Sequence, residues 1–153
     1  MTKDRLIETA KAIPAASPEA ADEYDRNRER LVAEVNRRLE ARPDLNGLVG
    51  RDNLDMMRDN HANHARFVRT LLKDFDPEVL VETVLWVFRA YRSRGFSDNY
   101  WAAQLNAWVS VLKETLSPES FEQIYPLYDW FIVHIPAFTF LSGESRSEEP
   151  ASR

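Results

Sequence analysis

The chain of 153 residues contains no cysteine, which excludes disulfides, thiolate nucleophiles and metal sites built on sulfur ligands. Glycine is also scarce, at four residues, so the few turns that require a positive φ are easy to recognise. No apolar run approaches the roughly 20 residues of a membrane span, and the opening MTKDRLIETAKAIPAA lacks the apolar core of a secretion signal. We therefore expect a cytoplasmic protein of one domain, without membrane association.

An excess of basic charge is missing as well. The formal net charge is −5, and the arginines between positions 26 and 38 alternate with acids such as Glu29 and Glu34. This alternation is typical of a solvated helix face with internal ion pairs. Because a phosphate-binding surface needs clustered basic residues, the composition argues against a nucleic-acid partner.

No segment shows the alternation of apolar and polar residues that is typical of strands, whereas apolar residues recur at helical spacing along most of the chain. The sequence therefore predicts an all-α bundle of about six helices. We expect a helical extension in residues 1–16, an ordered domain over 17–141 and a polar, disordered tail over 142–153. The expected helices span 17–41, 52–75, 77–94, a segment capped by Ser97, and 117–141 with a kink or boundary at Pro126; a corner with Gly47 and Gly50 joins the first two.

Two of the three histidines lie in the segment DNHANHARF, residues 59–67. They belong to a series with alternating gaps of three and four, which is the spacing of one helix face. Both therefore replace core residues in an apolar stripe, either as packed and hydrogen-bonded side chains or as groups that line a cavity and contact a ligand. A metal site would need His134 as a third ligand, and we do not favour one. The series is Leu54, Met57, His61, His64, Val68, Leu71 and Phe75.

Two stretches resemble passages of globins. RRLEARPDLNGLVG, residues 37–50, resembles the passage in which the second globin helix ends in a Pro-acid-Leu turn and a corner follows. AYRSRGFSDNYWAAQLNAWVSVLKETLSPE, residues 90–119, is similar to the bacterial globin passage from the haem-binding helix through the penultimate helix. The resemblance covers about residues 24–138 and implies a globin-like fold.

The resemblance also shows where this chain departs from the family. Tyr91 stands where globins place the proximal haem-binding histidine, and Val49 replaces the phenylalanine that packs on haem. The resemblance therefore implies a bacterial globin-like sensory or regulatory domain without conventional haem, which holds a small apolar ligand or none. It also implies a homodimer and a signalling partner protein. The residues expected to line the ligand cavity are His61, His64, Phe67, Phe88 and Tyr91.

Two alternatives remain open. The first is a haem-binding globin with an unusual axial ligand, either Tyr91, since a tyrosinate can ligate haem iron, or one of the two histidines of residues 59–67. The second is a structural helical interaction module without a ligand. We expect no enzyme activity, because no nucleophile, base and orienting group form a recognisable set. The remaining feature is a surplus of aromatic residues that serve the core or an interface, namely Trp86, Trp101, Trp108 and Trp130.

Overall fold

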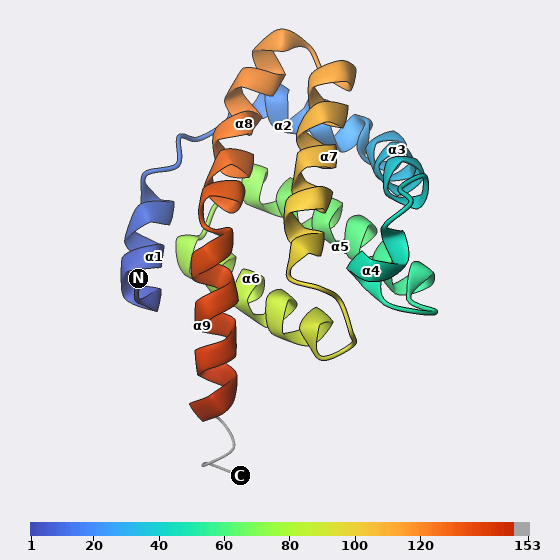
Figure 1. Cartoon of the computed structure of the whole chain (residues 1–153). Helices are drawn as coiled ribbons and strands as arrows, with labels where there is room; N and C mark the ends of the chain where they lie inside the picture. The colour runs from blue at the N-terminus through green and yellow to red at the C-terminus, as the bar shows by residue number, and fades with distance from the viewer. Residues whose placement is uncertain (149–153) are drawn as a thin grey trace.

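The computed structural model describes residues 1–148, and within this range the regular structure is entirely helical (Figure 1). The predicted all-α class is confirmed. The described residues form nine helices instead of about six, because two of the expected helices are divided and the corner contains a short one. The helices are α1 (Lys3–Lys11), α2 (Pro18–Arg26), α3 (Arg28–Glu40), α4 (Leu45–Val49), α5 (Leu54–Lys73), α6 (Pro77–Arg92), α7 (Asn99–Thr115), α8 (Pro118–Val133) and α9 (Ile135–Glu148).

Three helices begin where a capping side chain precedes a proline. Ser17, Asp76 and Ser117 each accept a hydrogen bond from a backbone N–H in the first turn of the helix that follows. Proline at the next position costs nothing there, because its missing N–H would be unpaired in any case. The starts of α2, α6 and α8 are therefore encoded locally.

The helix expected over 17–41 is two helices. Asn27 interrupts it with φ −98° and ψ 3°, and its side-chain Nδ2 donates to the Glu23 carbonyl at 2.8 Å. A side-chain amide that bonds to the preceding turn competes with the helical backbone. The chain therefore changes direction between α2 and α3.

The last expected helix is also divided, but not at Pro126. α8 continues through Pro126 to Val133, and the break falls at His134, just before Pro136. Proline 136 has no N–H to continue the backbone ladder. α9 then runs to Glu148, so the predicted end of the ordered domain at residue 141 lies inside a helix; residues 149–153 of the predicted tail lie outside the described residues.

The corner between α3 and α5 is tied to the end of α6. Gly50 has φ +87°, and a Cβ atom there would lie 3.1 Å from Asn53 Nδ2 and 3.2 Å from the Gly95 carbonyl oxygen. The same Asn53 amide donates to the carbonyls of Val49 and Arg94, at 2.7 and 2.8 Å. Only glycine fits this left-handed and crowded position.

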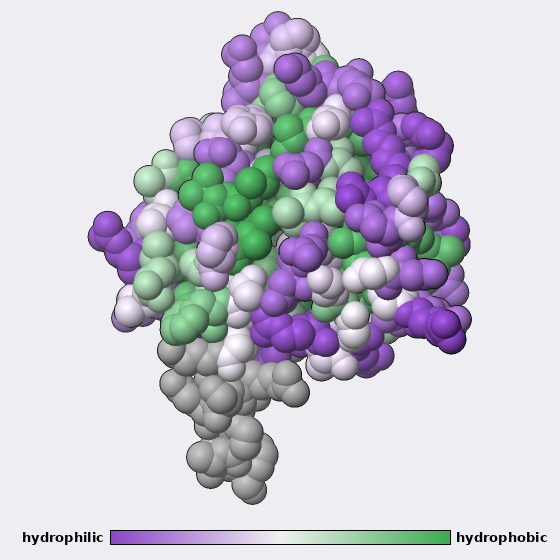
Figure 2. Space-filling view, in the orientation of Figure 1, coloured by the Kyte–Doolittle hydropathy of each residue, from purple (hydrophilic) through white to green (hydrophobic). Residues whose placement is uncertain are grey.

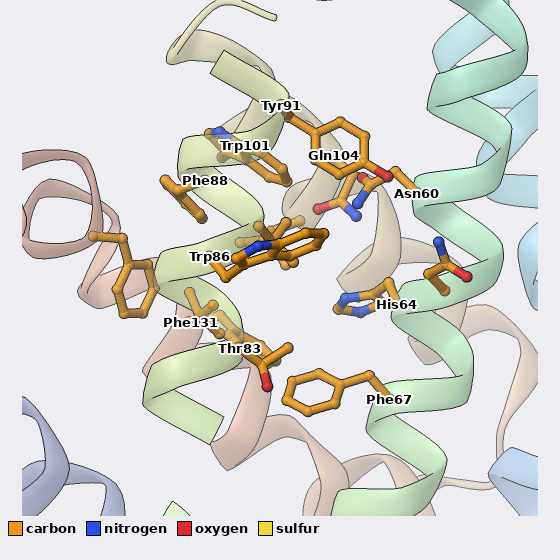
Figure 3. A pocket seen from close by; sticks show the side chains of 15 residues that line it. Asn60, His64, Phe67, Thr83, Trp86, Phe88, Tyr91, Trp101, Gln104 and Phe131 are labelled. Atoms are coloured by element: carbon orange, nitrogen blue, oxygen red, sulfur yellow. The ribbon is translucent and has the colours of Figure 1, made fainter. Parts of the chain in front are cut away.

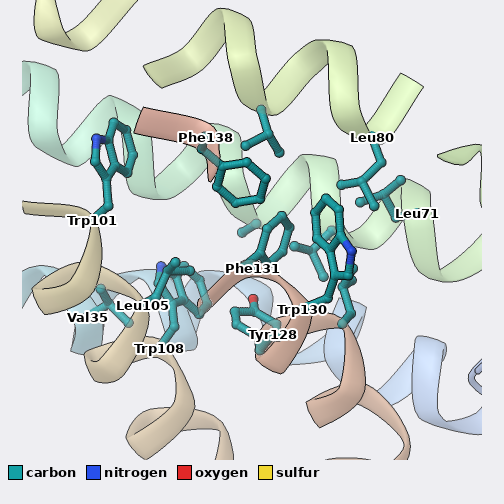
Figure 4. Close-up of a cluster of buried hydrophobic side chains, with 14 of the residues drawn as sticks. Val35, Leu71, Leu80, Trp101, Leu105, Trp108, Tyr128, Trp130, Phe131 and Phe138 are labelled. Carbon is teal, nitrogen blue, oxygen red and sulfur yellow. The ribbon is translucent and has the colours of Figure 1, made fainter. Parts of the chain in front are cut away.

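Helices distant in sequence build the core. α3 packs on α5 and α7, α2 on α8, α7 on α8, and α6 on α1 and α9, whereas α5 and α6 are not packed closely on each other. None of the described helices is both long and apolar enough to cross a membrane. Figure 4 shows the aromatic part of the core, with Trp101 and Trp108 from α7, Tyr128, Trp130 and Phe131 from α8, and Phe138 from α9.

Candidate functional site: a cavity between α5 and α6

A cavity of about 240 Å³ lies between α5 and α6 (Figure 3). Aromatic and aliphatic side chains form most of its wall, and none of the described residues that line it is Asp, Glu, Lys or Arg. Side chains from five helices, α5 to α9, line it. The main apolar lining residues are Phe67 from α5, Val84 and Phe88 from α6, Trp101 and Leu105 from α7, Phe131 from α8 and Phe138 from α9.

Trp86 marks the outer side of the cavity. Its side chain is 61% exposed although it belongs to the lining, and Figure 3 shows its ring projecting from α6 toward α5. The exposed Asn63 and the partly exposed Thr83 also line the cavity. The cavity therefore opens to the surface between α5 and α6, beside Trp86.

His64 points into this cavity from α5 (Figure 3). Its ring lies 4.8 Å from the Trp108 ring and 5.4 Å from the Tyr128 ring, measured between centroids. Its Nε2 atom is 2.9 Å from the Tyr128 hydroxyl. Burial lowers the pKa of His64 to about 3, so the imidazole is neutral at pH 7.

His61, one turn earlier, is fully buried and does not line the cavity. Its Nδ1 lies 2.5 Å from Asn36 Oδ1 on α3, and its Nε2 lies 2.9 Å from the Tyr100 hydroxyl on α7. Burial lowers the pKa of His61 to about 4. This histidine therefore links α5 to two neighbouring helices, and the two histidines do not share one site.

Tyr91 lines the cavity from α6, opposite the helix that carries His64. Burial raises the pKa of the Tyr91 hydroxyl, and the nearby amides of Asn60 and Asn63 oppose this shift only in part. The phenol is therefore neutral at pH 7, and a phenolate, the form that binds haem iron, is disfavoured here. Arg92, next in sequence, is engaged with Asp98 and the Thr139 carbonyl.

Of the five residues expected at the cavity, His64, Phe67, Phe88 and Tyr91 line it and His61 does not. The third histidine, His134, is engaged within its own helix turn, where Nδ1 donates to the Trp130 carbonyl oxygen at 2.8 Å. In the part of the chain that the structure describes, no three His, Cys, Asp or Glu side chains are grouped to hold a metal ion.

The sequence reasoning missed two lining residues with distinctive chemistry, Gln104 and Trp86. Gln104 is 1% exposed and lies among the buried residues of α7. Its position three residues after Trp101 and four before Trp108 was a usable signal, because a polar residue within an apolar helix stripe is unusual. Trp86 carried no such signal, since an exposed tryptophan looks the same in sequence as a buried one.

Comparison with family models, with curated proteins and with solved structures finds no significant match to this chain. The protein is therefore characterised by its own fold and cavity. It is a helical domain with a largely aromatic cavity, without a charged residue among the described lining residues, that opens between the consecutive helices α5 and α6.

Proposed function

We propose that this protein is a globin-like sensory or regulatory domain that holds a small apolar ligand between α5 and α6, without conventional haem. The observation that carries the proposal is the cavity of about 240 Å³ with an aromatic wall and no charged lining residue among those described. An engineered apolar cavity of roughly 150 Å³ binds benzene. A space of this size and chemistry is therefore suited to a molecule of that class.

The placement of two residues supports the globin-like interpretation. Tyr91 on α6 corresponds to the proximal position in the resemblance, and His61 or His64 on α5 falls near the position of the distal histidine of globins. Of these, Tyr91 and His64 line one cavity from facing helices. This arrangement also favours the haem alternative, in which Tyr91 or His64 is an unusual axial ligand, whereas the raised pKa of the Tyr91 hydroxyl opposes it.

A sensory domain needs a surface that contacts the protein to which it signals. Figure 2 shows apolar surface over the lower part of α8 and the start of α9, within an otherwise mostly hydrophilic face. Val133 and Phe140, from these two helices, are 60% and 61% exposed. We propose that this surface forms a homodimer or contacts a signalling partner protein.

Ligand-observed NMR with benzene tests the proposed function. We expect benzene to bind the wild-type protein and to be excluded by Val84→Phe, which fills the cavity from α6. Val79→Phe is the matched control, because Val79 is on the same helix but 49% exposed. Absence of binding to the wild type, or equal binding to the Val84→Phe variant, would contradict the proposal and favour a structural module without a ligand.

A further inference from the structure

Two polar side chains at the wall of the cavity, Gln104 and His64, have hydrogen-bonding groups that no described residue uses. The Gln104 amide is 1% exposed and has no hydrogen-bond partner among the described residues. Asn60 also lines the cavity, but both ends of its amide are engaged, since Oδ1 accepts from the Tyr100 hydroxyl and the amide also bonds the Tyr91 hydroxyl. His64 uses Nε2 but not Nδ1. Polar groups of a protein interior are nearly always paired, so the unused groups of Gln104 and His64 are available to a polar atom of a ligand in the cavity.

A chain of hydroxyl groups fixes which nitrogen of His64 carries the proton. The Tyr24 and Tyr128 hydroxyl oxygens are 2.8 Å apart and buried, and Tyr128 is in turn 2.9 Å from His64 Nε2. Both hydroxyl protons are used only if Tyr24 donates to Tyr128 and Tyr128 donates to Nε2. In the opposite direction the Tyr24 proton is buried without an acceptor, which is costly. Neutral His64 therefore carries its proton on Nδ1, and this group is a donor.

We infer that the ligand is a neutral molecule with an apolar body and one hydrogen-bond-accepting group, best matched by a carbonyl, which accepts from His64 Nδ1–H and from the amide of Gln104. The inference rests on the proposed function and adds the ligand's chemistry. It assigns the apolar body to the aromatic part of the cavity, beside Phe88 and Trp101.

We infer a neutral ligand because none of the described lining residues is Asp, Glu, Lys or Arg. An ionised carboxylate in the cavity would lose its hydration without gaining a cation. His64 does not supply one, because it stays uncharged at neutral pH. A carbonyl compound loses far less hydration on entry, and the two donors replace the water that it leaves.

The tautomer of His64 is testable without any ligand. Two-bond ¹H–¹⁵N correlation spectra of the histidine-labelled protein identify the protonated ring nitrogen. We expect His64 to be protonated on Nδ1. In Tyr128→Phe, which removes the hydroxyl that donates to Nε2, we expect the proton to be redistributed between the two nitrogens. Protonation of Nε2 in the wild-type protein would overturn the inference.

A matched pair of probes tests the ligand class. Acetophenone and α-methylstyrene have the same shape, but only acetophenone has a carbonyl oxygen. We expect acetophenone to bind roughly tenfold more tightly, as measured by ligand-observed NMR titration, and benzoate not to bind. In His64→Leu and Gln104→Leu the preference for acetophenone should fall, whereas Thr83→Val, an isosteric change at the same cavity, should retain it.

The outcomes separate the inference from the proposed function. Equal or tighter binding of α-methylstyrene would overturn the inference that the ligand needs a hydrogen-bond-accepting group, but would still support a cavity for apolar ligands. Tight binding of benzoate overturns the neutrality of the ligand. If neither neutral probe enters the cavity, both the inference and the proposed function fail.

Discussion

At the scale of single residues, His64 supports both the core and the cavity wall. Its ring packs beside Trp108 and Tyr128, and its Nε2 is hydrogen-bonded to the Tyr128 hydroxyl at 2.9 Å. We expect His64→Ala to lower the free energy of unfolding by roughly 1–3 kcal/mol, through lost packing and an unpaired hydroxyl. Urea denaturation at pH 7 measures the change. His64→Leu should recover much of the loss, because leucine restores the apolar contact; an unchanged stability of His64→Ala would show that the ring is not packed.

The two inward-facing histidines, His61 and His64, make the free energy of unfolding depend on pH. Their folded-state pKa values, about 4 for His61 and about 3 for His64, lie below the ordinary value of about 6.5. As the pH falls below about 6.5, the unfolded chain binds protons that the folded chain does not. We therefore expect the free energy of unfolding to fall by up to about 1.4 kcal/mol per pH unit for each histidine.

Urea denaturation at several pH values between 7.5 and 5 measures this slope, which should be roughly halved in His64→Leu. The stabilisation should be fully present above pH 7. A free energy of unfolding that stays constant across this range would mean that the histidines titrate normally and are not buried.

Helical spacing predicted that both histidines face inward, but it could not predict that they meet different surroundings. Residues three apart on a helix differ in direction by about 60°. This difference turns His61 toward Asn36 and Tyr100, and His64 toward the cavity. Which neighbours occupy each direction depends on the packing of α3, α7 and α8, which no local pattern specifies.

At the scale of helices and corners, the two glycines near α4 are expected to respond oppositely to substitution. Gly50→Ala should lower the free energy of unfolding by about 1–3 kcal/mol, because its φ is +87° and the new Cβ would crowd the Gly95 carbonyl. Gly47→Ala is the control, since a Cβ there meets nothing within 4 Å and the residue is helical. It should be neutral or slightly stabilising. Equal destabilisation by both substitutions would contradict the corner geometry.

Helix starts were predictable to a degree that helix breaks were not. Ser17, Asp76 and Ser117 act on the N–H groups of their own first turns, so the sequence alone shows the start. Proline did not show the break, because Pro126 lies inside α8 whereas the chain turns just before Pro136. The break falls where the packing partners change, because α8 packs on α2 and α7 whereas α9 packs on α6.

At the scale of the whole molecule, we expect no tight haem binding. The cavity has no histidine from α6, and the half-buried phenol of Tyr91 resists ionisation. Titration with hemin should give no stoichiometric uptake and no sharp Soret band. A sharp band would support the haem alternative, and its loss in Tyr91→Phe would identify the phenolate as the ligand.

We also expect a homodimer formed through the exposed apolar residues of α8 and α9. Sedimentation at micromolar concentration should show a species of about twice the 17.8 kDa of one chain. A Val133→Glu, Phe140→Glu double variant should be a monomer, because it places charge in the interface. Val79→Glu, at another exposed apolar position, should leave the dimer intact. A wild-type protein that sediments only as a monomer would rule out the dimer.

Xenon binding, followed by the methyl signals of the lining residues, tests the central claim that the space between α5 and α6 is an apolar ligand cavity. Xenon enters apolar cavities without needing a polar partner. We predict that xenon shifts the methyl signals of Val84, Val87 and Leu105 in the wild-type protein. We also predict that filling the cavity with Leu105→Phe abolishes the shifts of the two valine signals. Wild-type spectra that do not change under xenon, or shifts that persist in the filled variant, would contradict the account.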